Sequence, residues 1–304
     1  MKTLKIITIG FIILIAAAGG LGFYFYKSGS LAKPEIKSMS NHWGKVNLQE
    51  TEIITSADIY NPNPVSIPIN RINVEIYMNG IKLASGETRD INLIANKNSQ
   101  IEFTTILNNT KLPEWWYTNI KNGGHTTVLM KTTVYFNLLG REFSFPPIEI
   151  KKDITTNILG SASMKFSGNS GLPLGAPEIR SMTNRWGNIT LGKTQVITQL
   201  KVYNPNPFPV PVKSIDYSIT MNNILMASGK SNSVELPPHS EKVIIAYTYI
   251  DNKDIPMWWV SHIKNHETTL MVIKGKMVFD IAGKTLEIPL PEYKKKFKTN
   301  ILSQ

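Results

Sequence analysis

Apolar and polar residues alternate with a period of two along most of the chain beyond its N-terminal segment. In TEIITSADIY the alternate residues from Ile53 to Ile59 share one face, and the residues between them share the other. INVEIYMNGIKLASGE predicts a hairpin that turns at Asn79-Gly80, and VYFNLLGREFSF predicts a second hairpin that turns near Gly140. Short strands separated by such turn signals indicate an all-β sandwich.

The same pattern occurs twice, at a constant offset of 143 residues (203 − 60 = 143), because YNPNPVSIPI begins at Tyr60 and YNPNPFPVPV at Tyr203. PEIKSMSNHWG matches PEIRSMTNRWG, and LPEWWYTNIKN matches IPMWWVSHIKN, at that offset. Each copy has about 125 residues, the size of one domain. GSASMKFSGNSGLPLG between the copies is rich in Gly and Ser, as a flexible linker is. We therefore expect domains at 31–159 and 176–304, joined by a linker at 160–175.

One segment in each copy departs from this period. In LPEWWYTNIKNGG, Pro113 suits the first turn of a helix, and the Gly-Gly pair suits its end. Trp116 and Ile120 are four residues apart and share a face of that helix. We expect a short helix packed by its tryptophans over one mouth or face of each sandwich. The tryptophans concerned are Trp115, Trp116, Trp258 and Trp259.

The repeated Asn-Pro-Asn-Pro motif should end the strand before it. It consists of Asn61, Pro62, Asn63 and Pro64 in the first copy, and of Asn204, Pro205, Asn206 and Pro207 in the second. Proline fixes φ and removes a backbone donor, so the ladder cannot continue past Tyr60. Residues before proline stay extended, and asparagine side chains can bond nearby backbone. We interpret the motif as a structural device that protects a sheet edge, with a binding loop as the alternative.

The N-terminus has a different pattern, with 21 uncharged residues between Lys5 and Lys27. As a helix with ~1.5 Å per residue this run reaches ~32 Å, about the thickness of a bilayer core. It ends in the aromatic cluster FYFY, which suits the membrane interface. We predict a single-pass anchor within 1–30, with the N-terminus inside and the domains extracytoplasmic, because a short basic tail precedes the span. A signal peptide cleaved near the alanines at 16–18 is the alternative.

The composition limits which kinds of site and partner the chain can have. With 304 residues, 42% of them hydrophobic, the chain can bury two cores. There are no cysteines, which excludes disulfides, Cys-based zinc sites and thiol nucleophiles. The formal charge of +11 favours contact with an anionic surface, whether nucleic acid, acidic lipid or polyanionic envelope. The basic tail KKKFK is interpreted as a solvated end, and no nucleic acid is expected, because no nucleic-acid-binding pattern accompanies it.

No catalytic, cofactor-binding or metal-binding set of residues recurs in both copies. None of the five histidines has a histidine counterpart at the repeat offset. His262 and His266 have the spacing of a metal pair, but no third ligand is evident nearby. The acidic residues shared by the copies lie at the ends of the domains, where local salt bridges or caps are expected. We therefore expect a protein that is not an enzyme and that needs no cofactor.

A strand that ends in Asn-Pro-Asn-Pro and continues into Ile-Pro-Ile or Val-Pro-Val resembles the water stress and hypersensitive response (WHy) domain. That domain belongs to the folded, atypical late embryogenesis abundant proteins. The alternating strand before the motif, the Ala-Ser-Gly triplet and the later helix are also similar, and the resemblance covers nearly all of the chain beyond the anchor. It implies two tandem β-sandwiches of the fibronectin III or immunoglobulin type, each with one short helix. It also implies no catalytic residues and an association with desiccation, and membrane-anchored tandem forms occur among archaeal members.

The leading functional hypothesis is a non-enzymatic, membrane-anchored protein that shields membranes or client proteins when water is scarce. A lipid-binding or lipid-transfer module is the alternative, with a groove under the helix that carries Trp115, Trp116, Trp258 and Trp259 in the two copies. Simple core packing of these tryptophans competes with that alternative. A module for adhesion or assembly of the cell envelope is a further alternative. The sequence does not indicate the client, the lipid or the oligomeric state.

Overall fold

The computed structural model describes Ala32 and residues 34–138, 141–144, 146–155, 164–165, 177–281, 283–290 and 292–302. These residues divide into two compact units, one built mainly from the first repeat and one mainly from the second. The predicted anchor within 1–30 lies outside the described residues. In the part of the chain that the structure describes, no helix has the length and apolar character needed to cross a membrane.

Strands make up most of both domains. The first domain contains β1 (Glu35–Val46), β2 (Glu50–Tyr60), β3 (Ile67–Met78), β4 (Ile81–Leu93), β5 (Asn98–Asn108), the 3-10 helix η1 (Asn109–Lys111), α2 (Leu112–Lys121), β6 (His125–Leu138), β7 (Arg141–Ser144) and β8 (Ile148–Thr155). The second contains β10 (Glu178–Ile189), β11 (Lys193–Tyr203), β12 (Val210–Met221), β13 (Ile224–Ser231), β14 (Val234–Leu236), β15 (Glu241–Asp251), η3 (Asn252–Asp254), α3 (Ile255–Lys264), β16 (Thr268–Ile281), β17 (Lys284–Pro289) and β18 (Tyr293–Lys298). Within the segment predicted as a linker, β9 (Met164–Lys165) pairs with β10.

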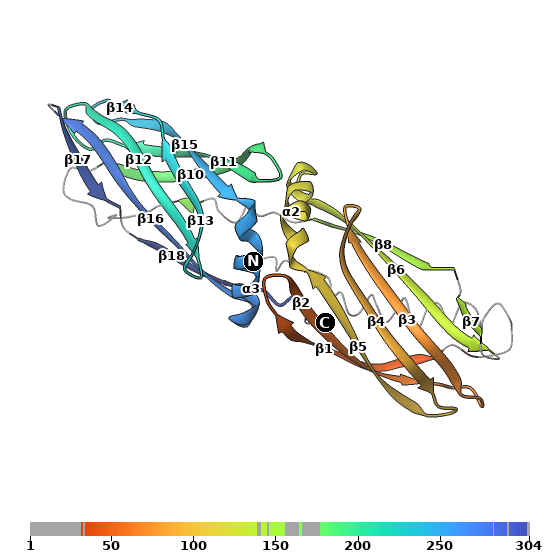
Figure 1. Cartoon of the computed structure of the whole chain (residues 1–304). Coiled ribbons are helices and arrows are strands. Elements are labelled where there is room, and N and C mark those ends of the chain that lie inside the picture. Colours follow the sequence, from red (N-terminus) through yellow and green to blue (C-terminus); the bar gives the residue numbers. More distant parts are fainter. Residues whose placement is uncertain are drawn as a thin grey trace. The chain divides into compact units, whose positions relative to one another are not determined.

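Each domain is a curled antiparallel sheet that forms two layers, and each carries one short α-helix (Figure 1). In the first domain the hydrogen-bonded order is β1-β2-β5-β4-β3-β6-β7, and β8 also pairs with β6. Strand β4 pairs with β3 along most of its length and with β5 at residues 84–87, so it joins the two layers. The second domain repeats this order as β10-β11-β15-β13-β12-β16-β17, with β14 on β12 and β18 on β16. The prediction of an all-β fold with two tandem sandwich domains is confirmed.

The alternation of β2 places its apolar residues in the core, as predicted. Ile53, Ala57 and Ile59 are buried, and the residues between them are partly exposed. Thr55 lies on the same buried face, where its hydroxyl donates to Asn41 Oδ1 at 2.7 Å. Strand β11 of the second domain buries the equivalent face. The repeat thus preserves the face of the strand that each core needs.

An aromatic ring packs against a glycine in each core, but the ring comes from a different strand in each domain. A Cβ atom on Gly86 would meet the ring of Phe103, from β5, at 2.7 Å. A Cβ atom on Gly229 would overlap the ring of Tyr217, from β12. Smaller side chains occupy the matching positions, Ala246 and Val74. This exchange keeps both cores filled, and it explains why the Ala-Ser-Gly triplet ends in glycine in each repeat.

The predicted hairpin turn at Asn79-Gly80 is present, with φ angles of 51° and 81°. Asn79 Oδ1 accepts from the backbone N–H of Thr127 at 2.9 Å, and Asn79 Nδ2 donates to Thr118 Oγ1 of α2 at 3.3 Å. One asparagine side chain therefore ties the hairpin, the helix and the start of β6 together. Asn222 makes the equivalent contacts in the second domain.

The second predicted hairpin is present where it is described. Gly283, with a φ angle of 74°, separates β16 from β17. Its counterpart near Gly140 lies outside the described residues, although β6 and β7 pair as expected. The basic tail differs from the prediction of a solvated end, because it forms β18 and pairs with β16. Partly exposed residues alternate there with exposed lysines, a pattern that protects an edge strand from pairing with other chains.

Candidate functional site

The Asn-Pro-Asn-Pro motif follows β2, and its first asparagine is completely buried. Asn61 Nδ2 donates to the carbonyl oxygens of Val65 and Leu93, both at 2.9 Å. Asn61 Oδ1 accepts from Asn63 N at 3.0 Å and from Asn63 Nδ2 at 2.8 Å. Both polar atoms of the Asn61 side chain are therefore hydrogen-bonded, as their burial requires.

The second copy of the motif repeats this arrangement. Asn204 Nδ2 donates to the carbonyl oxygens of Phe208 at 2.9 Å and Leu236 at 3.0 Å. Asn204 Oδ1 accepts from the backbone and side-chain nitrogens of Asn206 at 3.0 and 2.9 Å. In both copies the first asparagine uses its side-chain donors on backbone carbonyls of its own domain, which fits the predicted structural role of the motif. The prolines supply the bends without leaving unpaired donors.

Asn63 also holds the chain where it enters the first domain. Ala32 N donates to Asn63 Oδ1 at 2.6 Å, and Asn63 Nδ2 donates to the carbonyl of Ala32 at 2.8 Å. Two apolar side chains lie in the loops held by the motif, Val65 with 49% and Ile94 with 45% of its surface exposed. The end of the domain at which the chain arrives is thus partly apolar.

The tryptophans of α2 and α3 are half-buried in both domains. Trp115 Nε1 donates to Thr126 Oγ1 at 3.1 Å, and Trp258 Nε1 donates to Thr269 Oγ1 at 3.0 Å. The following residues, Trp116 and Trp259, are half-buried as well. The donors of the first indole in each pair are therefore used inside the domain. This placement favours the packing of the indoles at the end of each core.

The histidine pair noted in the sequence is divided between interior and surface. His262 is 1% exposed, and its Nδ1 lies 2.8 Å from Thr269 Oγ1. Burial lowers the pKa of His262, because the charged form loses its solvation. His266 is exposed beyond the end of α3, and Asn119 occupies the position of His262 in the first domain. Among the described residues no group of three or more His, Asp or Glu side chains could hold a metal ion.

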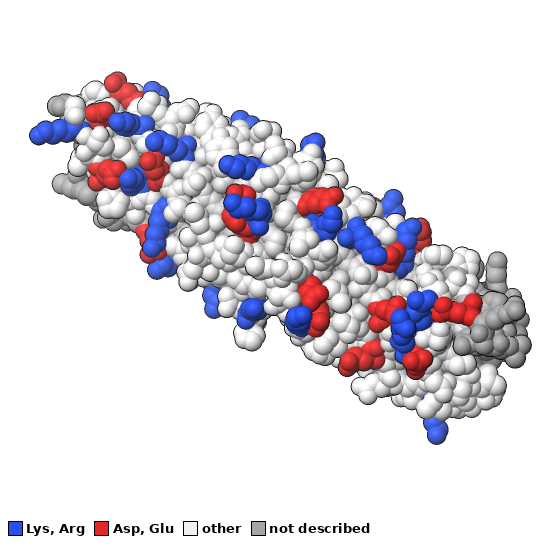
Figure 2. Space-filling model, in the orientation of Figure 1, with Lys and Arg blue, Asp and Glu red and all other residues white. Residues whose placement is uncertain are grey.

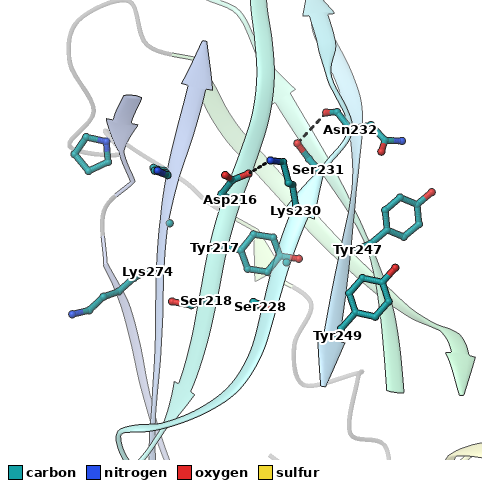
Figure 3. Close-up of a pocket in the computed structure, with 14 residues that line it drawn as sticks. Asp216, Tyr217, Ser218, Ser228, Lys230, Ser231, Asn232, Tyr247, Tyr249 and Lys274 are labelled. Atoms are coloured by element: carbon teal, nitrogen blue, oxygen red, sulfur yellow. Dashed lines mark hydrogen bonds and ion pairs between the residues drawn. The ribbon is translucent and has the colours of Figure 1, made fainter. Parts of the chain in front are cut away.

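A shallow hollow of about 970 Å³ lies on the outer face of the second domain (Figure 3). Ser218 of β12 and Ser228 of β13 lie in its middle. Tyr247 and Tyr249 of β15 stand on one side, and Lys274 of β16 stands on the other. The sequence analysis did not identify this feature. Its signal would have been the difference in charge and aromatic content between the two repeats at the same strand positions.

Basic residues dominate the charged lining of the hollow. They are Lys230, Lys274 and Lys276, with Asp216 as the acidic residue among them. The side chains of Lys230 and Lys274 are 70% and 71% exposed. Lys230 Nζ lies 3.8 Å from Asp216 Oδ1, a distance that indicates a weak ion pair, and this carboxylate oxygen is itself buried. Lys274 Nζ lies 3.4 Å from Glu292 Oε1, and Lys276 Nζ lies 2.6 Å from Glu287 Oε1, so each lysine has a carboxylate beside it. Because the side chains of Lys230 and Lys274 are mostly exposed, their ammonium groups can exchange these partners for an anionic ligand.

Comparisons with known proteins give one family. The family model described as "Late embryogenesis abundant protein" matches residues 56–149 and 199–292, one match in each domain. An uncharacterized protein of Methanocaldococcus jannaschii is 26% identical over 198 residues, which cover 64% of this chain and 92% of the relative. A crystal structure of a protein from Archaeoglobus fulgidus has a TM-score of 0.37 and 27% identity, over 40% of this chain and 98% of that chain. The solution structure of an Arabidopsis thaliana protein has a TM-score of 0.29 and 20% identity, over 41% of this chain and 85% of that chain.

Proposed function

Because this chain belongs to the late embryogenesis abundant protein family, we propose that it is a non-enzymatic, membrane-anchored protein that protects membranes or client proteins when water is scarce. The observation that carries this proposal is the family match to both repeats, from β2 to β8 and from β11 to the residue before β18. Within the family, the proposal assigns both domains to the WHy type. The support is the Asn-Pro-Asn-Pro motif, which each domain uses in the same way.

The construction of the domains supports a protective role. The asparagine side chains of the two motifs are hydrogen-bonded within their own domains, which favours a fixed shape for each domain. On the face drawn in Figure 2, basic and acidic side chains are interspersed over both domains. Mixed charges of this kind keep a protein surface hydrated and limit self-association. A rigid particle with such a surface can separate membranes or client proteins as water is withdrawn.

The proposal places the first domain close to the bilayer. Asn63 holds Ala32 by two hydrogen bonds, and Ala32 lies six residues after Tyr26, the last residue of the predicted span (32 − 26 = 6). Six residues reach at most ~20 Å even when fully extended. The partly apolar end with Val65 and Ile94 would then face the membrane interface. The proposed orientation has the N-terminus inside and the domains extracytoplasmic.

Drying a labile enzyme tests the protective role. The full chain in phospholipid nanodiscs is dried with lactate dehydrogenase, and enzymatic activity is measured after rehydration. Empty nanodiscs with an equal mass of albumin serve as the control. We expect more activity to survive with the chain than with albumin. Survival equal to or below the albumin control would contradict the proposal.

A destabilised variant tests whether protection comes from the folded domains or only from the mass of added protein. Asn61→Ala combined with Asn204→Ala removes the buried hydrogen bonds of both motifs while leaving the surface charge unchanged. If the folded domains protect, this variant should protect less than the parent chain at the same concentration. Equal protection by both chains would show that folded sandwiches are not needed.

A further inference from the structure

Outward-facing residues of four neighbouring strands build the hollow of the second domain. Directly paired residues of antiparallel strands lie on the same face, so β16, β12, β13 and β15 present rows of side chains across the sheet. The first row is Lys274, Ser218, Ser228 and Tyr249, and the second row is Lys276, Asp216, Lys230 and Tyr247. Lys274 and Lys276 therefore occupy one side of the hollow, the two tyrosines occupy the other, and Lys230 lies between them, next to Tyr247.

The matching rows of the first domain have a different chemistry. They are Lys131, Glu75, Ser85 and Ile106 in the first row, and Thr133, Asn73, Glu87 and Thr104 in the second. Three lysines stand against one aspartate in the second domain, whereas one lysine stands against two glutamates in the first. Neither tyrosine has an aromatic counterpart. Since both domains form the same sheet, folding does not require the basic and aromatic residues of the hollow.

The two tyrosines form an aromatic wall in which Tyr249 is exposed and Tyr247 is partly exposed (Figure 3). Tyr247 and Tyr249 are two residues apart on β15, so their rings leave the same face about 7 Å apart. Tyr249 is 47% exposed, and Gln195 Nε2 donates to its hydroxyl at 2.9 Å, which helps to fix the ring. An exposed ring offers a flat apolar face beside polar groups. Such a wall suits a ligand that itself combines apolar faces with hydroxyl groups.

The remaining groups of the hollow define the charge of that ligand. Lys230 and Lys274 supply ammonium donors for carboxylates, and the hydroxyls of Ser218 and Ser228 both donate and accept. Asp216 adds an acceptor for ligand hydroxyls. This combination favours an anionic ligand with many hydroxyl groups, which a polysaccharide with carboxylate groups has in greater number than a nucleic acid.

We propose that this hollow binds an acidic polysaccharide, with the tyrosine rings packed against sugar rings and the lysines paired with uronate carboxylates. The serine hydroxyls bond the sugar hydroxyls between these two sides. The ligand would connect the second domain to a carbohydrate layer while the predicted anchor holds the first domain at the membrane. This binding is separate from protection during drying and would persist if that activity were absent.

Binding to polygalacturonate tests the site directly. The full chain in nanodiscs is immobilised for biolayer interferometry, and polygalacturonate is compared with neutral dextran and with oligo(dT). We expect polygalacturonate to bind at least tenfold more tightly than either of the others. Tyr247→Ala with Tyr249→Ala should lower the affinity at least tenfold, and so should Lys230→Glu with Lys274→Glu.

The first domain provides matched controls. Lys131→Glu and Ile106→Ala change the positions equivalent to Lys274 and Tyr249, and they should leave the affinity within twofold of the parent. The urea midpoint of each variant checks that its fold is kept. If the double variants are unstable, the affinity of Lys274→Glu alone tests the site, because a substitution at a side chain that is 71% exposed should leave the fold intact.

Four results would overturn the proposal. They are no binding of polygalacturonate, equally tight binding of oligo(dT) or dextran, unchanged affinity in the tyrosine variant, and an equal loss in the controls of the first domain. A fifth comes from size-exclusion chromatography. If the parent chain associates with itself, Lys230→Glu with Lys274→Glu abolishes this, and polygalacturonate does not bind, then the face serves a second copy of the chain instead.

Discussion

Replacing the first asparagine of the motif should destabilise its domain far more than replacing the proline beside it. Asn61→Ala leaves the carbonyls of Val65 and Leu93 and the backbone N–H of Asn63 without their side-chain partner. A buried polar group without a partner costs roughly 1–3 kcal/mol, so the three groups, of which the Val65 carbonyl takes part in a part-buried bond, cost about 3–5 kcal/mol together at the lower end of that range. Pro62→Ala removes no hydrogen bond and mainly frees the unfolded chain, which costs below about 1 kcal/mol.

Hydrogen exchange in increasing urea measures this difference one domain at a time. Peptides from β2 report on the first domain, and peptides from β11 report on the second. Asn61→Ala should lower the urea midpoint of the β2 peptides and leave the β11 peptides unchanged. Asn204→Ala should do the reverse, and Pro62→Ala serves as the matched control. The reasoning is refuted if Asn61→Ala costs no more than Pro62→Ala, because the buried hydrogen bonds would then contribute little.

Three further predictions concern the second core, its histidine and the topology of the chain. Gly229→Ala should lower the unfolding free energy of the second domain by about 1–3 kcal/mol, because the new Cβ atom would overlap the ring of Tyr217. In urea unfolding, adding Tyr217→Val should restore part of this loss, and an unchanged urea midpoint for Gly229→Ala alone would contradict the packing. Since burial lowers the pKa of His262 in the folded state, the stability of the second domain should fall as the pH drops below the unfolded-state pKa of ~6.5, and His262→Asn should reduce that fall. Urea midpoints that change in parallel for both chains between pH 8 and pH 5 would contradict this. Because the chain has no cysteines, Leu48→Cys, at a position 48% exposed, gives a single thiol that a membrane-impermeant maleimide should label on intact cells, and labelling only after lysis would contradict an extracytoplasmic placement.

Local patterns predicted the fold because they are short-range and strict. The alternation from Ile53 to Ile59 fixes which face of β2 is buried, and the Asn79-Gly80 turn fixes the register of the hairpin. The stop after Tyr60 follows from the missing donors of the prolines. The basic tail was misinterpreted because most of its residues are lysines. The signal of a strand was the alternation of Tyr293 and Phe297 with these lysines.

The contacts that matter for the sites are long-range, so the sequence could not specify them. The bond from Asn61 to Leu93 spans 32 residues, and nothing in the motif itself names that partner. The hollow depends on the cross-strand neighbours of Ser218 and Ser228, which only the pairing of the strands defines. The comparison of the repeats at the common offset could have raised the question, because Tyr249 replaces the Ile106 of the first copy.

Leakage from dried vesicles tests the protective role at a membrane most directly. Liposomes filled with a fluorescent dye and carrying the full chain are dried and rehydrated beside liposomes carrying a peptide of residues 1–30 alone. The account predicts that the full chain retains clearly more dye than the anchor peptide at the same surface density. Equal leakage from the two preparations would show that the sandwich domains do not protect the membrane that holds them.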